Sequence, residues 1–153
     1  AFVSKHTKGT RHRARQRALE ILFSREFHEE NDIQYAENEI LRSGAAEDET
    51  DDEVVLAAEN EYCEYLVTTT TAHVAEFDAI IQSLSKKWDL SQINRANKNI
   101  MRLALCELIY PKEAGLAASI VINEAIVLAR EYSDDQSARF VNGILGAYTK
   151  ERA

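Results

Sequence analysis

Apolar side chains recur every three to four residues along most of this chain, which is the spacing that places them on one face of an α-helix. No segment alternates apolar and polar residues with the period of two that a half-buried strand requires. The pattern therefore predicts helices and no sheet. The predicted helices cover about residues 10–28, 33–42, 54–85, 89–110, 118–132 and 133–150.

Pairs of polar residues spaced three apart mark the expected starts of three of these helices. Thr50 with Glu53, Asp89 with Gln92, and Ser133 with Gln136 each have the pattern of a capping box. Pro111 ends one helix, and Gly115 suits the turn that follows it.

Two stretches interrupt this regularity. Residues 1–9 are polar and lack periodicity, so we expect a mobile basic arm, and residues 45–53 are expected to form an acidic loop. The run of four threonines at 68–71 is a poor helix interior, because β-branched residues have low helix propensity. We expect the long helix 54–85 to be bent or broken there.

The composition agrees with a helical protein that has a real core. Of 153 residues, 45% are apolar, and only 5 are Gly and 1 is Pro, whereas sheet proteins need many such turn residues. We expect a single all-α domain, with N-terminal helices in 10–85 and C-terminal helices in 89–150.

The same composition bears on the compartment. No apolar run approaches the ~18 residues of a membrane span, and no signal peptide is recognisable, so a cytoplasmic protein is expected. Cys63 and Cys106 lie within apolar patterns and are interpreted as buried thiols.

Enzyme chemistry has no candidate in the sequence. The four histidines lack metal-ligand spacing, and no glycine-rich phosphate loop or nucleophile motif is present. We therefore expect no catalytic residue, no metal site and no cofactor. Arg102 and Glu124 lie among apolar residues and are interpreted as members of structural ion pairs.

Charge is distributed unevenly around the net value of -8. Residues 1–19 hold six Lys or Arg and no acid (+6), whereas residues 26–64 hold fifteen acids and one Arg (−14). Cations at the start of a helix oppose its macrodipole, so helix stability does not explain the basic segment. Phosphate binding does explain it, although a merely soluble helix end is an open alternative.

Two parts of the chain resemble the NusB family of transcription antitermination factors. They are RHRARQRALEILFSREF (11–27) and the segment from NIMRLALCELIY (99–110) through INEA (122–125) to SARFVNGIL (137–145). The resemblance implies an all-helical fold of two small bundles that share a core. It also implies binding of single-stranded boxA RNA, a heterodimer with the ribosomal protein NusE, and action with NusA and NusG on RNA polymerase, notably in rRNA operons.

The resemblance also implies which residues form the sites. Two sets follow from it: the RNA-binding residues are Lys8, Arg11, Arg13, Arg15, Phe23, Ser137, Arg139, Phe140 and Asn142, and the protein-partner residues are Asn97, Lys98 and Met101. Phe140 suits either stacking on a base or a place in the core. Asn97 and Gln136 stand where the family often has an acid.

Two other functions fit a helical chain of this kind. NusB-like domains also begin RNA cytosine methyltransferases, but no catalytic cysteine motif or βαβ segment follows here, so an enzyme is not expected. A homodimeric scaffold is the other alternative. Because the charge separates along the chain, we expect NusE to bind an acidic or neutral face away from the basic arm.

Overall fold

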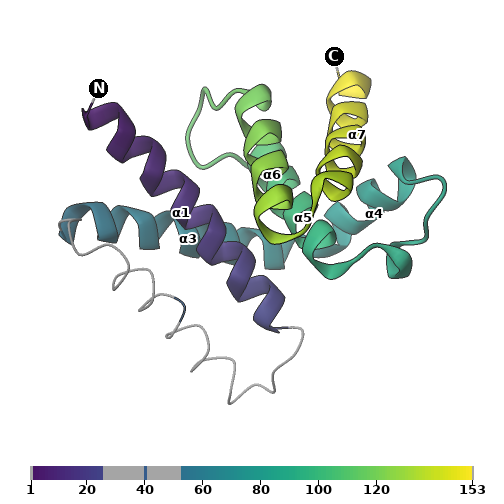
Figure 1. Ribbon diagram of the computed structural model, residues 1–153, viewed down its shortest axis with the longest axis horizontal. Coiled ribbons are helices and arrows are strands. Elements are labelled where there is room, and N and C mark those ends of the chain that lie inside the picture. Colours follow the sequence, from purple (N-terminus) through teal and green to yellow (C-terminus); the bar gives the residue numbers. More distant parts are fainter. Residues whose placement is uncertain (1, 26–39, 41–52, 153) are drawn as a thin grey trace. The chain divides into compact units, whose positions relative to one another are not determined.

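The computed structural model describes residues 2–25, 40 and 53–152, and side chains within 11–25, 40 and 56–152. All regular structure in these residues is helical, which confirms the predicted all-α class (Figure 1). The described elements are α1 (Phe2–Arg25), α3 (Glu53–Ala72), α4 (Val74–Leu84), the 3₁₀ turn η1 (Leu90–Gln92), α5 (Arg95–Ile109), α6 (Ala118–Tyr132) and α7 (Asp135–Arg152).

The chain divides into two compact units, residues 1–68 and 69–153. The sequence grouped the helices of the single predicted domain into 10–85 and 89–150. In the structure α4 packs on α5 and α7, within the second unit. The boundary consequently lies within α3, at the threonine run.

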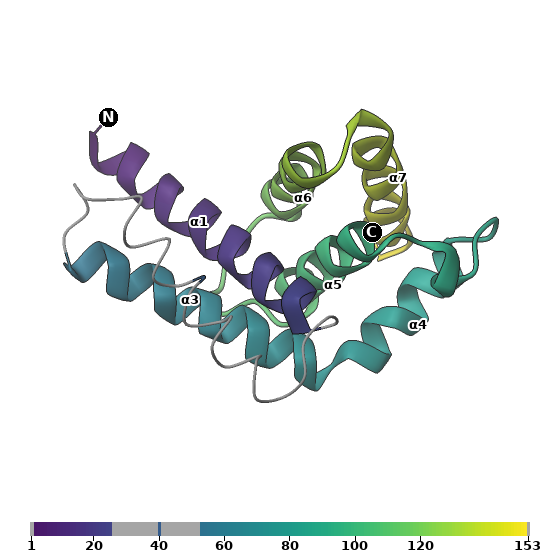
Figure 2. The same cartoon turned by 60° about the horizontal axis from the view of Figure 1, so that its bottom comes forward.

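The first unit contains α1 and most of α3, which contact one another (Figure 2). The buried positions of α1 recur at helical spacing, as predicted, and α3 contributes a second apolar stripe. These buried residues are Ala14, Ala18, Leu19, Ile21 and Leu22 on α1, and Tyr62, Cys63, Leu66 and Val67 on α3.

Helix α1 begins earlier than expected. We predicted a start near Thr10 after a mobile arm, but the helix starts at Phe2. The missing apolar period in residues 2–9 does not prevent a helix, because periodicity reports burial of one face rather than helix formation, and Gly9, the weakest helix former of the stretch, costs only about 1 kcal/mol. The predicted helix 33–42, apart from the helical Ile40, lies outside the described residues, and so do the acidic loop 45–52 and Thr50.

The long helix is broken, as predicted, but at His73 rather than within the threonine run 68–71, which is itself helical. Helix α3 ends at Ala72 and α4 begins at Val74, with His73 between them. The His73 ring stacks on Tyr110 with 4.1 Å between ring centroids. Tyr110 in turn donates a hydrogen bond of 2.6 Å to Oε1 of Glu76, and this bond raises the pKa of the Tyr110 phenol. These contacts tie the start of α4 to the end of α5.

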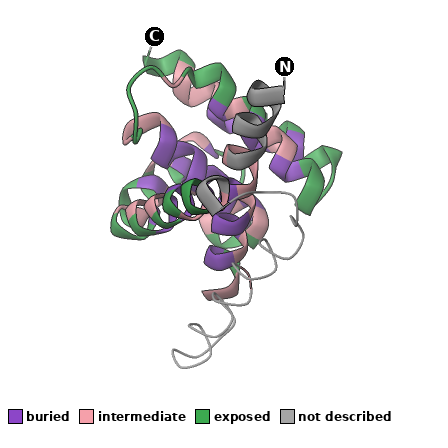
Figure 3. Cartoon of the chain, turned by 90° about the vertical axis from the view of Figure 1, so that its left-hand side faces the viewer, coloured by how far each residue is buried: buried purple, intermediate pink, exposed green. Residues whose placement is uncertain are grey.

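Helices α4 to α7 form the core of the second unit, with α6 and α7 both packed on α5. Figure 3 shows buried and exposed positions alternating along single helices, as the amphipathic pattern requires. In the connection between α5 and α6, Gly115 adopts a φ of 91°, which confirms its predicted role in the turn. Fully buried side chains of this core include Phe77, Ile81, Ile100, Leu103, Leu105, Val121, Val141 and Leu145.

Two of the predicted helix starts need correction. The Asp89–Gln92 capping box is present, but it opens only η1, and α5 starts at Arg95. Asn94 caps α5 by accepting a 2.8 Å hydrogen bond from the backbone N–H of Asn97. At α7 the cap is Asp134, which accepts a 2.7 Å bond from the N–H of Ser137, whereas Ser133 is the C-cap of α6.

The cap on α5 leads to a stability prediction. Asn94→Ala should lower the free energy of unfolding by about 1 kcal/mol, since it removes the acceptor for a helix-terminal N–H. Asn94→Asp keeps such an acceptor and should stay within about 0.5 kcal/mol of the wild type. Urea unfolding followed by circular dichroism measures both. Equal stability of all three proteins would show that the cap does not contribute.

Candidate nucleic-acid interface

The arginines of α1 lie against α3 within the first unit. The Arg11 guanidinium carbon is 3.7 Å from the centroid of the Tyr62 ring, and that of Arg15 is 6.0 Å from it. Both separations fall within the range of cation–π attraction. Arg15 is only 5% exposed, so its stem packs as part of the core.

Acidic partners hold two further arginines of this segment. Arg13 pairs with Glu59 at 3.8 Å, and Glu59 is buried. Arg17 pairs with Glu20 at 3.2 Å, one helical turn away. The sequence placed these cations at the start of a helix, but they lie within α1 (Phe2–Arg25), where they neutralise or cover groups of α1 and α3. Arg11 and Arg13 nevertheless keep part of their surface exposed.

Two other residues of α1, Lys8 and Phe23, are predicted to bind RNA. Lys8 lies on the helix, but its side chain is outside the described residues. Phe23 is 37% exposed near the end of α1. Its place in the RNA site stays a prediction.

The start of α7 is tied to α5 by a network of hydrogen bonds. Asn97 Nδ2 donates to Oγ of the buried Ser137 at 3.0 Å, and this hydroxyl lies 2.9 Å from Ser133 Oγ. Ser137 thus joins two helices and helps to fix where α7 begins. Further along α7, Arg139 and Asn142 are exposed and Phe140 is half-buried.

The predicted protein-partner residues are less accessible than expected. Asn97 is 6% exposed, and Met101 is 0% exposed. The expectation of a direct partner contact is withdrawn for Met101, because α5 turns that side chain into the core. Lys98 has intermediate exposure and is the accessible residue of the three.

An open pocket of about 280 Å³ lies beside the start of α7. It brings together Asn97, Ser137 and Phe140, which the sequence had assigned to two separate sites. Its remaining walls come from the connection between α4 and α5 and from the first turn of α7: Trp88, Gln92, Ile93, Asn94, Asp134 and Gln136. Our sequence reasoning missed Trp88, which is 51% exposed; the signal was a lone tryptophan directly after Lys86 and Lys87.

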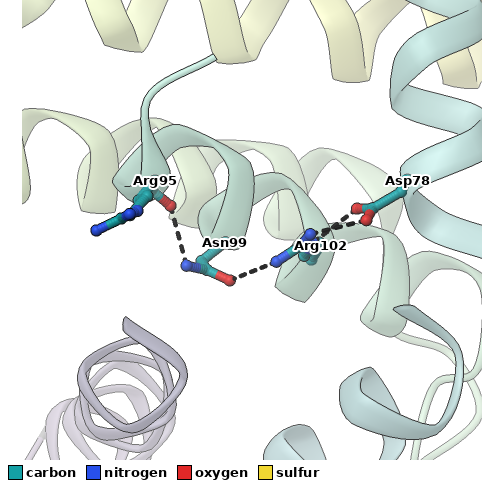
Figure 4. Close-up of polar contacts among 4 residues, drawn as sticks. All are labelled: Asp78, Arg95, Asn99 and Arg102. Atoms are coloured by element: carbon teal, nitrogen blue, oxygen red, sulfur yellow. Dashed lines mark hydrogen bonds and ion pairs between the residues drawn. The ribbon is translucent and has the colours of Figure 1, made fainter. Parts of the chain in front are cut away.

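An ion pair links α5 to α4 (Figure 4). Arg102 Nε and a terminal guanidinium nitrogen each donate to the Asp78 carboxylate at 2.7 Å. Asn99 accepts from Arg102 at 3.1 Å and donates to the Arg95 carbonyl at 3.0 Å. The interpretation of Arg102 as a member of a structural ion pair is confirmed, with Asp78 on α4 as its partner. Bidentate pairs of this kind fix orientation as well as adding energy.

Other side-chain chemistry is sparse in the described part of the chain. Cys63 and Cys106 are buried thiols, as predicted, and burial raises the pKa of Cys106 to about 11. No group of three metal-ligating side chains occurs among the described residues. None of the described helices combines the length and apolar character needed to cross a bilayer.

Comparison with known proteins decides the family. The model of the NusB family matches residues 12–150. The chain belongs to the NusB family. The transcription antitermination protein NusB of Chloroflexus aggregans is 36% identical over 136 residues, which cover 89% of this chain and 84% of that protein. The resemblance in the arginine-rich segment and in SARFVNGIL is thereby confirmed.

Solved NusB structures share the fold. NusB of T. maritima superposes with a TM-score of 0.73 at 30% identity, covering 92% of this chain and 91% of that one. A second structure contains the antitermination factors NusB and NusE in complex with dsRNA. It matches with a TM-score of 0.69 at 27% identity, over 93% of this chain and 97% of that one.

Proposed function

We propose that this chain is a transcription antitermination factor that binds boxA RNA together with NusE and helps RNA polymerase resist termination, notably in rRNA operons. The observation that carries the proposal is the match, over nearly the whole chain, to a NusB that was solved with NusE and dsRNA. The relatives are named as antitermination proteins rather than as enzymes. Binding rather than catalysis is therefore the activity we assign.

The RNA surface in this proposal has two parts. On α1, Lys8, Arg11, Arg13 and Arg15 supply positive charge, with the exposed ring of Phe23 on the same helix. On α7, Arg139 and Asn142 are exposed beside Phe140. Cationic side chains attract the phosphate backbone and release its counterions, whereas aromatic rings stack on unpaired bases.

The protein partner in this proposal is NusE, and Lys98 on α5 is the accessible residue we assign to its binding. The complex would act with NusA and NusG on RNA polymerase. The function we propose needs no cofactor and no membrane, and we place it in the cytoplasm. A homodimer is the competing assembly, and light scattering with and without boxA RNA distinguishes it from an RNA-bound monomer.

The direct test is fluorescence anisotropy of labelled single-stranded RNA titrated with the protein. An RNA that carries boxA should bind more tightly than an RNA of the same composition in permuted order. Tight binding with equal affinity for both RNAs would refute boxA recognition. Absence of binding to either RNA, with NusE also present, would refute the RNA-binding function altogether.

A further inference from the structure

Trp88 is the sole tryptophan of the chain, and half of its surface is exposed at the edge of the pocket beside α7. Tryptophan is among the side chains that gain most from leaving water. Its exposure therefore needs an explanation. One explanation would be that the connection between α4 and α5 has no fixed conformation.

The connection is, however, well fixed. The Trp88 carbonyl accepts hydrogen bonds from Gln82 Nε2 and from Ser85 Oγ, both at 3.2 Å. Gln82 also accepts from the N–H of Leu90 at 2.8 Å, and Asp89 is held in its capping box. The backbone on both sides of Trp88 is thus anchored to the end of α4 and to η1. The Trp88 ring is therefore held at the edge of the pocket by a connection with a fixed backbone.

Asn97, which also lines this pocket, carries an unused hydrogen-bonding group. Its side chain is 6% exposed, its Nδ2 donates to Ser137, and its Oδ1 is buried without a partner in the described residues. A buried acceptor left without a donor is unfavourable. Because this oxygen is itself buried, a ligand N–H in the pocket reaches it only when the Asn97 side chain turns the oxygen outward.

We propose that this pocket binds a single unpaired nucleobase of RNA, which stacks on Trp88 and points an N–H of its edge toward Asn97. The inference rests on the proposed function, and it adds a base-binding site with Trp88 as the stacking residue. The volume of about 280 Å³ lies just below the range of about 300–1,000 Å³ for pockets that hold drug-sized ligands, so it suits one planar group.

The charges around the pocket fit a base that arrives with its phosphates. Lys86 and Lys87, directly before Trp88, are exposed, and Arg139 is exposed on α7. Asp134 is the acid in the pocket wall, and its Oδ1 already accepts from the Ser137 N–H. Proteins recognise single-stranded RNA by stacking on the faces of unstacked bases and by hydrogen bonding to their edges. RNA is therefore favoured over a protein segment as the occupant.

The test uses the intrinsic fluorescence of Trp88, which reports this pocket alone, beside anisotropy of the labelled RNA, which reports binding anywhere. Adding boxA RNA to the full chain should quench the tryptophan emission at the same RNA concentrations that raise the anisotropy. Trp88→Ala should weaken boxA binding by about tenfold or more. Trp88→Phe, which keeps an aromatic ring, should retain much of the wild-type affinity for boxA RNA. The matched control is Ile120→Ala, which removes an apolar side chain that is also 51% exposed, and it should leave RNA binding unchanged.

The outcomes separate this inference from the proposed function. If the RNA binds without quenching and Trp88→Ala binds as the wild type does, the base pocket is refuted while RNA binding stands. If NusE alone shifts the emission and Trp88→Ala weakens NusE binding only, the pocket is a protein contact and the inference is overturned. If no RNA binds the wild type with or without NusE, the anisotropy refutes the proposed function, and the base pocket fails with it.

Discussion

Replacing Arg11, Arg13 and Arg15 together with alanine should lower the affinity for boxA RNA by about two orders of magnitude or more. Each arginine that contacts a phosphate also releases counterions from a single strand, at a slope of about 0.7 in a plot of log affinity against log salt. With three such contacts removed, the slope measured for the triple variant should be smaller in magnitude than that of the wild type by up to about 2. Anisotropy titrations at several salt concentrations measure both quantities.

The structure adds a second effect, which the experiment has to separate. Arg13 pairs with the buried Glu59, and Arg11 covers the Tyr62 ring, so the variant should also lose stability. A matched lysine triple at the same three positions keeps the charges but not the planar guanidinium groups, and it should retain most of the salt slope. An alanine triple at Lys112, Lys150 and Arg152 removes equal charge elsewhere. A folded arginine-to-alanine triple with wild-type affinity and slope would exclude α1 from the RNA site.

Phe140→Ala should weaken RNA binding by about 1–3 kcal/mol, the range found for loss of a stacked base. The ring is half-buried and lines the pocket, so its removal should destabilise the fold by less than the about 3–5 kcal/mol typical of a fully buried phenylalanine. Phe77→Ala provides the comparison, since Phe77 is 0% exposed in the core of the second unit. Binding titrations at a temperature where both variants are folded, together with urea unfolding, measure the two effects.

The loss of RNA affinity relative to the loss of stability shows whether Phe140 stacks on a base or belongs to the core. Phe140→Ala should lose binding out of proportion to stability, whereas Phe77→Ala should lose stability and keep the RNA affinity of its folded fraction. If Phe140→Ala loses as much stability as Phe77→Ala and binds RNA normally, then Phe140 is a core residue and has no stacking role.

The helical class could be predicted because one physical signal dominates this sequence. Apolar residues recur at the helical period, and the low helix propensity of the threonine run indicated a break close to its actual place at His73, although the threonines themselves are helical. The ends of helices were harder to predict, since several polar residues compete to cap them. Asp134 takes the position that the spacing assigned to Ser133, because the cap depends on which backbone is extended and on which oxygen reaches the N–H.

The site was predicted less completely than the fold, for a related reason. The period of a helix indicates which residues face inward, but not what faces them from another helix. Glu59 and Tyr62 therefore could not be recognised as partners of Arg13 and Arg11, and the arginines looked unexplained by structure. Likewise, Trp88 lies 52 residues before Phe140 (140 − 88), and only the folded chain brings both to one pocket.

The central claim, that RNA and NusE bind this chain together, is tested most directly by titrating NusE into a preformed complex of the chain with labelled boxA RNA. The affinity for RNA should stay the same or increase, and one complex containing all three components should form, with an association rate that falls as salt is raised. Displacement of the RNA by NusE would contradict the account, because the two partners would then share one surface.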